Sequence, residues 1–262
     1  MIDLHTHILP GVDDGVETDD EAVEFARLAS QDGVRVLVAT PHCKEGTWDN
    51  GRDDVLSGVQ RLRRLLEREE VDLAVEPGAE VHLCPDLVER VRDGRAPTLA
   101  DNGKTLLLEL SLTQYPVELE KLIFELKLAG LEILLAHPER IRYFQEDPKR
   151  YEAVIRVGAY GQITTGSVLG TFGSRVKEYS AELLRKGLVH VLASDAHNTR
   201  GRSPVLTPAV EAIVPLVGER FARSMVDGVP RALLDGRTPE LPPVDATVSR
   251  RKTFLGRIFR RG

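Results

Sequence analysis

Cysteine, aromatic residues and long apolar runs are all scarce in this 262-residue sequence. With only Cys43 and Cys84, the chain cannot hold a disulfide framework, and it suits a reducing compartment. The longest apolar runs, such as 105–108 and 133–136, are far shorter than a membrane-spanning helix. The first residues, MIDLHTHILPG, lack the basic and then apolar regions of a secretory signal. These absences predict a cytoplasmic protein.

Acidic residues outnumber basic ones over most of the chain. The formal net charge is −6, but the last thirteen residues, RRKTFLGRIFRRG, hold six basic residues and no acid. The rest therefore has 29 basic residues against 41 acidic ones, a formal charge of −12. Because Lys and Arg neutralise phosphates in nonspecific nucleic-acid binding, an acidic body argues against that function. We expect no nucleic-acid partner.

The basic end of the chain is predicted to be a separate tail. The first linker-like stretch is TPELPPV at 238–244, so we expect one barrel domain at 1–243 and a flexible tail at 244–262. Apolar side chains of the tail fall on one face of a helix, which favours adsorption to the inner face of a membrane. A solubilising tail and a docking arm for an acidic kinase segment are the alternatives. The apolar side chains are Phe254, Leu255, Ile258 and Phe259.

Short β-rich runs alternate with longer helical segments along the chain. Several runs are almost continuously apolar, as strands buried on both faces require. Such alternation implies parallel strands joined by right-handed crossovers, in an open sheet or a closed barrel. Thr18 and Glu21 are predicted to form a capping box on the first helix. The predicted strands are 2–5, 34–40, 72–77, 105–110, 132–136, 159–164 and 189–194, and the predicted helices include 18–31, 52–69, 117–129 and 174–186.

Six of these seven strands end in residues that commonly bind metals. A barrel of parallel strands collects all of these ends on one face, whereas an open sheet collects only those at its switch point. The pattern therefore favours an α/β barrel with a metal site at its mouth. The residues are His5, His7, Asp14, His42, Glu80, Glu109, His137, Asp195 and His197.

The residue types indicate the chemistry of this site. In His5-Thr6-His7 the imidazoles lie on the same side of an extended segment, because side chains alternate with a period of two. Imidazole and carboxylate donors without thiolate suit Zn, Mn or Fe rather than a structural zinc site. So many ligands imply several ions, which attract a phosphate dianion and activate water. Each histidine alone could be an ordinary hydrogen-bonding residue, but five of the seven stand at strand ends.

Several other polar residues are interpreted as structural. His82 and His190 are the two histidines left over, and Asp13 is expected to cap a turn. Cys43, beside His42, is expected to be a small buried side chain.

A cysteine motif in the sequence is set aside. Cys84 and Arg90 match the C-x5-R pattern of cysteine-based tyrosine phosphatases. That chemistry needs free N–H groups and a stabilised thiolate. Asp86 and Glu89 lie within this segment and would repel phosphate, and no glycine opens its backbone.

With these motifs in place, the sequence resembles the PHP (polymerase and histidinol phosphatase) superfamily. Within it, the chain is similar to the bacterial manganese-dependent protein-tyrosine phosphatases found with capsule and exopolysaccharide systems. The resemblance implies a distorted (β/α)7 barrel, the PHP fold, with a trinuclear site. It is carried by IDLHTHILPGVDDG at 2–15, ATPH at 39–42, PGAEV at 77–81, LLLEL at 106–110, AHPER at 136–140 and ASDAHN at 193–198.

The resemblance also implies how the site residues are used. Two or three divalent ions are expected, with Mn²⁺ first and Fe or Zn as alternatives. Arg140 matches an arginine that binds the substrate phosphate, and Arg202 matches a second, with Arg200 as its alternative. His5, His7, Glu80 and Asp195 would hold one ion; Glu80 would bridge to a second, with Glu109 and His137; and Asp14, His42 and His197 would hold a third.

The activity implied by the resemblance is hydrolysis of phosphotyrosine on a bacterial tyrosine kinase that regulates polysaccharide export. A hydroxide that bridges the ions would attack phosphorus in line, while the ions and Arg140 take up charge. The alternatives are a small-molecule phosphatase of the histidinol-phosphate type, a PHP-type phosphodiesterase or nuclease, and a metal-binding regulator without turnover.

Overall fold

The computed structural model describes residues 1–245 of the chain. All seven predicted strands are confirmed, each within a few residues of its expected bounds. The described strands are β1 (Ile2–Thr6), β2 (Val36–Ala39), β3 (His42–Lys44), β4 (Trp48–Asp49), β5 (Ala74–Pro77), β6 (Glu80–His82), β7 (Thr105–Glu109), β8 (Glu132–Ala136), β9 (Tyr160–Thr164) and β10 (Val191–Ala193).

The strands follow seven paths, because two of the predicted strands are each continued, after a break of two residues, by a second piece that was not predicted. After Ala39 the chain passes Thr40-Pro41 and resumes as β3, and after Pro77 it passes Gly78-Ala79 and resumes as β6. The first pieces make the sheet β1-β2-β5, and the second pieces belong to the sheet β10-β9-β8-β7-β6-β3-β4. All pairings among the seven paths are parallel; only β4 pairs antiparallel, with β3.

Backbone hydrogen bonds join the first and last paths. Thr6 forms a parallel bridge with Ala196. The Asp195 N–H donates to the His5 carbonyl at 2.9 Å, and the His7 N–H donates to the Ala196 carbonyl at 2.9 Å. The arrangement agrees with the predicted α/β barrel, distorted where β2 and β5 break.

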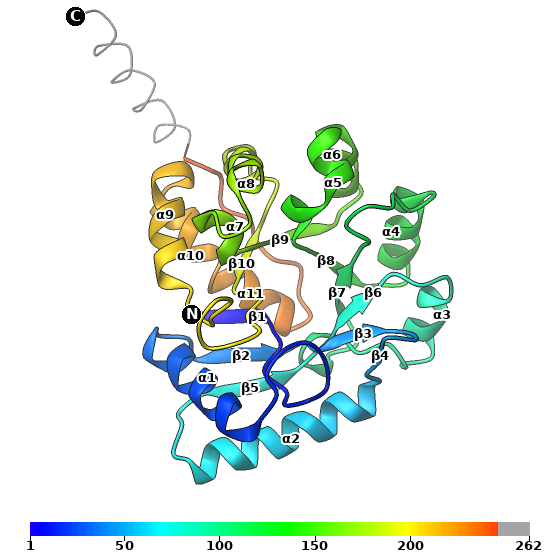
Figure 1. The fold of residues 1–262 in the computed structure, drawn as a ribbon. Coiled ribbons are helices and arrows are strands. Elements are labelled where there is room, and N and C mark those ends of the chain that lie inside the picture. The colour runs from blue at the N-terminus through cyan, green and yellow to red at the C-terminus, as the bar shows by residue number, and fades with distance from the viewer. Residues whose placement is uncertain (246–262) are drawn as a thin grey trace, which may run out of the picture.

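Helices cover the outside of the strands (Figure 1). The longest, α2, packs on β5, and α1 packs on α2. The α-helices are α1 (Asp19–Gln31), α2 (Arg52–Arg68), α3 (Leu87–Arg92), α4 (Leu119–Leu128), α5 (Arg142–Glu146), α6 (Pro148–Arg156), α7 (Thr165–Leu169), α8 (Ser174–Lys186), α9 (Thr207–Val217), α10 (Glu219–Ser224) and α11 (Gly228–Leu234).

The start of α1 differs in detail from the predicted capping box. Thr18 Oγ1 accepts from the Glu21 N–H at 3.2 Å, as predicted. The Glu21 carboxylate accepts instead from the Glu17 N–H, at 3.1 Å, so the return bond reaches one residue further back than a capping box requires. The helix still buries Ala22, Phe25, Ala26 and Ala29 against the core.

The predicted tail at 244–262 lies outside the described residues, except for its first two. Val244 packs on the core, and the Asp245 N–H donates to the Val217 carbonyl at 3.1 Å. Among residues 1–245, no helix is both long and apolar enough to span a membrane.

Candidate metal centre

The strand ends bring all nine predicted ligands to one end of the barrel. Eight of the side chains stand at, or within a few residues of, the end of a parallel strand, and Asp14 lies in the loop between β1 and α1. His137 after β8 and Asp195 after β10 have φ of 34° and 52°, in the left-handed region that only glycine adopts easily. Such strain persists where the surrounding structure enforces it, and it is typical of functional sites.

The first group of donor atoms is buried in the centre of the cluster. His5 Nε2 lies 3.2 Å from His7 Nε2, 3.3 Å from Glu80 Oε2 and 3.5 Å from Asp195 Oδ1. His7 Nε2 lies 3.6 Å from each of the same two carboxylate atoms. Ligand atoms about 2.1 Å from a tetrahedral ion are about 3.4 Å from one another, so this spacing suits a single cation.

A second group surrounds the other side of Glu80. His137 Nε2 lies 2.8 Å from Glu80 Oε1. His42 Nδ1 lies 3.0 Å from Glu80 Oε2 and 3.7 Å from Glu109 Oε2. Glu80 therefore faces donors of both groups: Oε2 meets the first group and His42, and Oε1 meets His137, as a bridging carboxylate would.

A third group lies toward the solvent. Asp14 Oδ1 is 3.4 Å from His42 Nε2 and 3.4 Å from His197 Nε2. The Asp14 side chain is about half exposed, and both imidazoles are largely buried. His42 thus faces the second group with one ring nitrogen and the third group with the other.

Two residues that orient the ligands escaped the sequence interpretation. Asp13 Oδ2 accepts from His7 Nδ1 at 2.7 Å and from the His42 N–H at 2.9 Å, while its Oδ1 caps the turn at Gly15 as predicted. Gln162 Oε1 lies 3.1 Å from His5 Nδ1. A metal-binding histidine usually has its second nitrogen fixed in this way. In the sequence, the position of Asp13 next to the predicted ligand Asp14 could have indicated its role. No sequence feature indicated the role of Gln162.

The two leftover histidines have different roles in the structure. His190 is structural, as predicted: its Nδ1 accepts from the Gly161 N–H at 3.1 Å, and burial lowers its pKa to about 4. His82, also predicted to be structural, lies beside the cluster: its Nδ1 is 3.1 Å from Oε2 of Glu109, a predicted ligand.

The charged side chains of the cluster shift one another's pKa values. Burial lowers the pKa of His5, but the carboxylates of Glu80 and Asp195 more than offset this and raise it to about 9. Burial raises the pKa of Glu80, but the charge of His5 and hydrogen bonds from His137 and His42 hold it well below its usual range. Without a cation, then, protons on His5 and His42 offset part of the carboxylate charge.

The donor set fits divalent cations. It combines imidazole and carboxylate atoms at ligand-to-ligand spacing, without thiolate. Among the described residues, three groups have ligand atoms close enough to hold an ion each: His5, His7 and Glu80; His42, Glu80 and Glu109; and His7, Asp14, His42 and His197. Glu80 Oε2 and His197 Nε2 are buried, and within residues 1–245 their contacts with His42 and Asp14 lack the geometry of a hydrogen bond. A cation would satisfy both atoms and replace the protons of the imidazoles.

Both predicted arginines lie against the cluster. Arg140 Nη1 is 2.8 Å from Asp195 Oδ2, and Arg202 Nη2 is 2.6 Å from Asp195 Oδ1. The Arg140 guanidinium also lies over the Phe172 ring, 4.5 Å from its centroid. The structure therefore places two cationic groups beside one predicted ligand.

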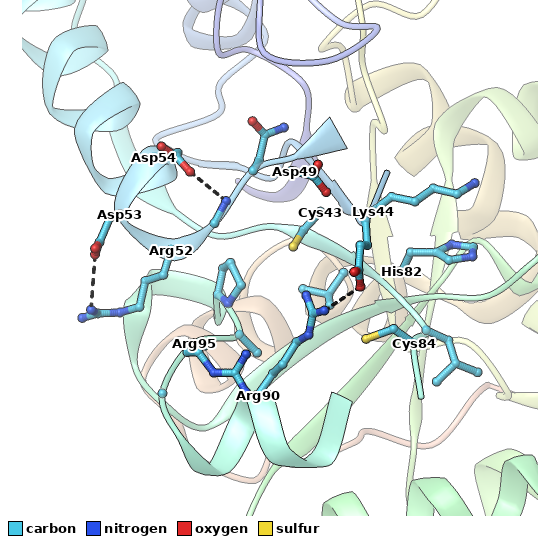
Figure 2. Close-up of a pocket in the computed structure, with 18 of the residues that line it drawn as sticks. Cys43, Lys44, Asp49, Arg52, Asp53, Asp54, His82, Cys84, Arg90 and Arg95 are labelled. Atoms are coloured by element: carbon cyan, nitrogen blue, oxygen red, sulfur yellow. Dashed lines mark hydrogen bonds and ion pairs between the residues drawn. The ribbon is translucent and has the colours of Figure 1, made fainter. Parts of the chain in front are cut away.

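A pocket of about 750 Å³ lies next to the cluster and is lined by both cysteines (Figure 2). Burial and a hydrogen bond to Asp86 raise the pKa of the Cys84 thiol to about 11. Arg90 is held by Asp86 at 2.8 Å and by Glu45 at 2.7 Å. A reactive cysteine needs a lowered pKa, so these surroundings disfavour a phosphatase motif built on Cys84 and Arg90.

Comparisons with known proteins agree with this geometry. The family described as "Capsular polysaccharide synthesis, CpsB/CapC" matches residues 1–235. Tyrosine-protein phosphatase YwqE of Bacillus subtilis is 33% identical over 254 residues, which cover 97% of this chain and 99% of YwqE. Tyrosine-protein phosphatase CpsB of Streptococcus pneumoniae is 28% identical, over 89% of this chain and 98% of CpsB.

Solved structures give the same result. A crystal structure from work on YwqE and CpsB, described there as unique metal-dependent tyrosine phosphatases, has a TM-score of 0.88 and 33% identity over 94% of this chain and 98% of that one. An amidohydrolase from Mycoplasma synoviae, at 11% identity, shares only the fold, with a TM-score of 0.58. The chain belongs to the CpsB/CapC family of capsular polysaccharide synthesis proteins.

Proposed function

We propose that this protein is a metal-dependent protein-tyrosine phosphatase that removes phosphate from phosphotyrosine on a bacterial tyrosine kinase controlling capsule or exopolysaccharide synthesis. The observation that carries the proposal is the largely buried cluster of five imidazoles and four carboxylates with two arginines at its edge. Membership of a family whose relatives are named tyrosine-protein phosphatases supports the choice of substrate.

The proposed ligands divide among three ions. His5, His7, Glu80 and Asp195 hold the first, which their mutual distances support. Glu80 also serves the second ion with Glu109 and His137, and Asp14, His42 and His197 serve the third. Mn²⁺ is the proposed metal, with Fe and Zn as alternatives, since the donors are imidazole and carboxylate. Bound divalent ions supply activated water at neutral pH and neutralise phosphate charge.

The protein's own residues bind and orient the substrate. Arg140 and Arg202 present guanidinium groups that match phosphoryl oxygens in geometry and charge. Packing on Phe172 holds Arg140 beside the cluster. Because a tyrosyl leaving group has a pKa of about 10, it departs more easily than an alkoxide, and assistance from a metal ion or water can suffice.

The cellular setting is part of the same proposal. The acidic body disfavours nucleic acid as a substrate, and a kinase substrate would place the enzyme in the cytoplasm. Contact with the inner face of the membrane through the basic residues 250–261 stays a prediction from sequence.

A substrate panel with metal control tests the proposal. Purified protein loaded with Mn²⁺ should hydrolyse a phosphotyrosine peptide far faster than histidinol phosphate or a phosphodiester. A chelator should abolish the activity, and Mn²⁺ should restore it. Preference for histidinol phosphate, or full activity in a protein with less than one ion per chain, would overturn the proposal.

A further inference from the structure

Each imidazole of the cluster needs something to fix its ring, and three of them have a hydrogen bond that does so. His5 Nδ1 lies 3.1 Å from Gln162 Oε1, and His7 Nδ1 lies 2.7 Å from Asp13 Oδ2. His197 Nδ1 lies 3.1 Å from the main-chain oxygen of Asp195. Such partners set the tautomer and the plane of a metal-binding ring.

His42 has no ring nitrogen left for a partner of this kind. Its Nδ1 is 3.0 Å from Glu80 Oε2, and its Nε2 is 3.4 Å from Asp14 Oδ1, so both nitrogens face proposed ligands. Rotation of the ring would turn both nitrogens away from their carboxylates. The orientation of His42 therefore has to be fixed through the faces of its ring.

Trp48 covers one of these faces. The His42 and Trp48 rings are stacked, with centroids 4.8 Å apart and planes inclined by 15°. The His42 ring also neighbours His7, whose ring is tilted by 53° with its centroid 4.6 Å away. An imidazole polarised by a cation carries partial positive charge, and tryptophan offers such charge the best aromatic face.

The hairpin of β3 and β4 holds Trp48 in this place. Trp48 pairs with Lys44 across the hairpin. The Asn50 side-chain amide donates to the His42 carbonyl at 2.8 Å and to the Val12 carbonyl at 3.0 Å. The hairpin is thereby fastened both to the proposed ligand and to the loop that carries Asp14.

We propose that Trp48 is a positioning residue for the metal centre: its stacking fixes the His42 ring and so sustains the ion held by Asp14, His42 and His197. The inference rests on the proposed function, from which it takes the assignment of these three ligands. It assigns a role in metal retention to the only tryptophan of the chain.

Binding of Mn²⁺ to the full-length protein tests this role without any measurement of activity. Equilibrium dialysis of wild type and Asp14→Asn first identifies the ion that depends on Asp14. Trp48→Leu should lower the affinity for that ion by about tenfold to a hundredfold and leave the affinities for the other ions as in wild type. Trp48→Phe, which keeps an aromatic face, should restore most of the affinity. Thr47→Ala, an exposed neighbour in the same hairpin, is the matched control and should bind as wild type.

The outcomes separate this inference from the proposal on which it rests. Wild-type affinities in Trp48→Leu, or no recovery in Trp48→Phe, would overturn the role of Trp48 and leave the phosphatase proposal standing. If Trp48→Leu lowered the affinity for every ion equally and also lowered the unfolding temperature, the proposed role would be overturned as well, since Trp48 would then be a general packing residue. A wild-type protein that binds no ion dependent on Asp14 would refute the ligand assignment itself.

Discussion

Asp13 shows how a residue without a metal-binding role of its own can control a metal centre. Its carboxylate is buried beside the cluster and accepts from His7 Nδ1 and from the His42 N–H. Burial raises its pKa, but the hydrogen bond and charge of His7 outweigh this, and the pKa of Asp13 is lowered. The group is therefore a charged acceptor that holds the Nδ1 proton of His7 and frees Nε2 for a cation.

Replacement of Asp13 tests this account. Asp13→Asn keeps the size but removes the charge, so His7 loses its strong acceptor and the affinity for Mn²⁺ should fall by about tenfold to a hundredfold. Titration of the chelator-treated protein with Mn²⁺ measures the change. Asp20→Asn, at an exposed position, should have no effect. Equal affinities in the two variants would show that Asp13 only caps its turn.

Arg140 and Cys84 give opposite expectations. Arg140→Ala should lower turnover of a phosphotyrosine peptide by about a hundredfold or more while Mn²⁺ remains bound, because a preorganised charge at the phosphate is lost. Cys84→Ser should keep most of the activity, since the raised pKa of its thiol disfavours the nucleophilic thiolate. Steady-state kinetics with metal analysis of the same samples decide the matter. Loss of activity in folded Cys84→Ser would contradict the mechanism.

At the scale of elements, the site was predictable because it is built from strand ends. Long apolar runs such as LLLEL at 106–110 mark buried strands, and parallel strands bring their carboxyl ends together. The short strands β3, β4 and β6 were missed, since HCK, WD and EVH are too short and too polar to show a pattern. Trp48 and Gln162 could not be found either, because their contacts with the cluster depend on how distant segments meet.

The break between β5 and β6 depends on one glycine. A Cβ at Gly78 would lie 2.8 Å from Val38 Cγ1 and 2.9 Å from Leu99 Cδ2, both buried. These contacts leave no space for a side chain where the strand path bends toward Glu80. The strand β5 can therefore pass into β6, and deliver this ligand, only with glycine at the bend.

Gly78→Ala should accordingly damage both stability and metal binding. Overpacking of this kind costs about 1–3 kcal/mol in the free energy of unfolding, and the shift of β6 should displace Glu80 and weaken Mn²⁺ binding. Urea unfolding of the metal-free and metal-loaded proteins measures both effects. The control is Gly228→Ala, where a Cβ would meet open space. If Gly78→Ala unfolds and binds Mn²⁺ as wild type does, the bend does not need glycine.

At the scale of the whole molecule, the cluster links folding to pH and to metal. Hydrogen bonds and charges of nearby carboxylates raise the pKa of His5 to about 9 and that of His42 to about 11, against the lowering effect of burial. In the unfolded chain an imidazole has a pKa of about 6.5. The folded metal-free protein therefore binds more protons than the unfolded chain above this pH.

The stability of metal-free protein should consequently fall as pH rises from about 6.5 to 9, the window between the unfolded and folded pKa values of His5. Below this window the contribution of the protonated imidazoles is complete. Bound Mn²⁺ requires neutral imidazoles and replaces their protons, so the loaded protein should not lose stability over the same range. The stabilisation that Mn²⁺ provides should therefore grow with pH.

Thermal unfolding at several pH values, with chelator and with excess Mn²⁺, checks this expectation. His190→Gln is a suitable control: burial lowers the pKa of this structural histidine to about 4, so it is neutral in the folded protein throughout the window and largely neutral in the unfolded chain above about pH 7.5. That variant should keep the same slope of stability against pH in this upper part of the window as the wild type. His5→Gln should flatten the slope of the metal-free protein, because it removes a group that releases its proton on unfolding. A metal-free protein whose stability is constant or rises from pH 6.5 to 9 would show that protons do not balance the carboxylates of the cluster.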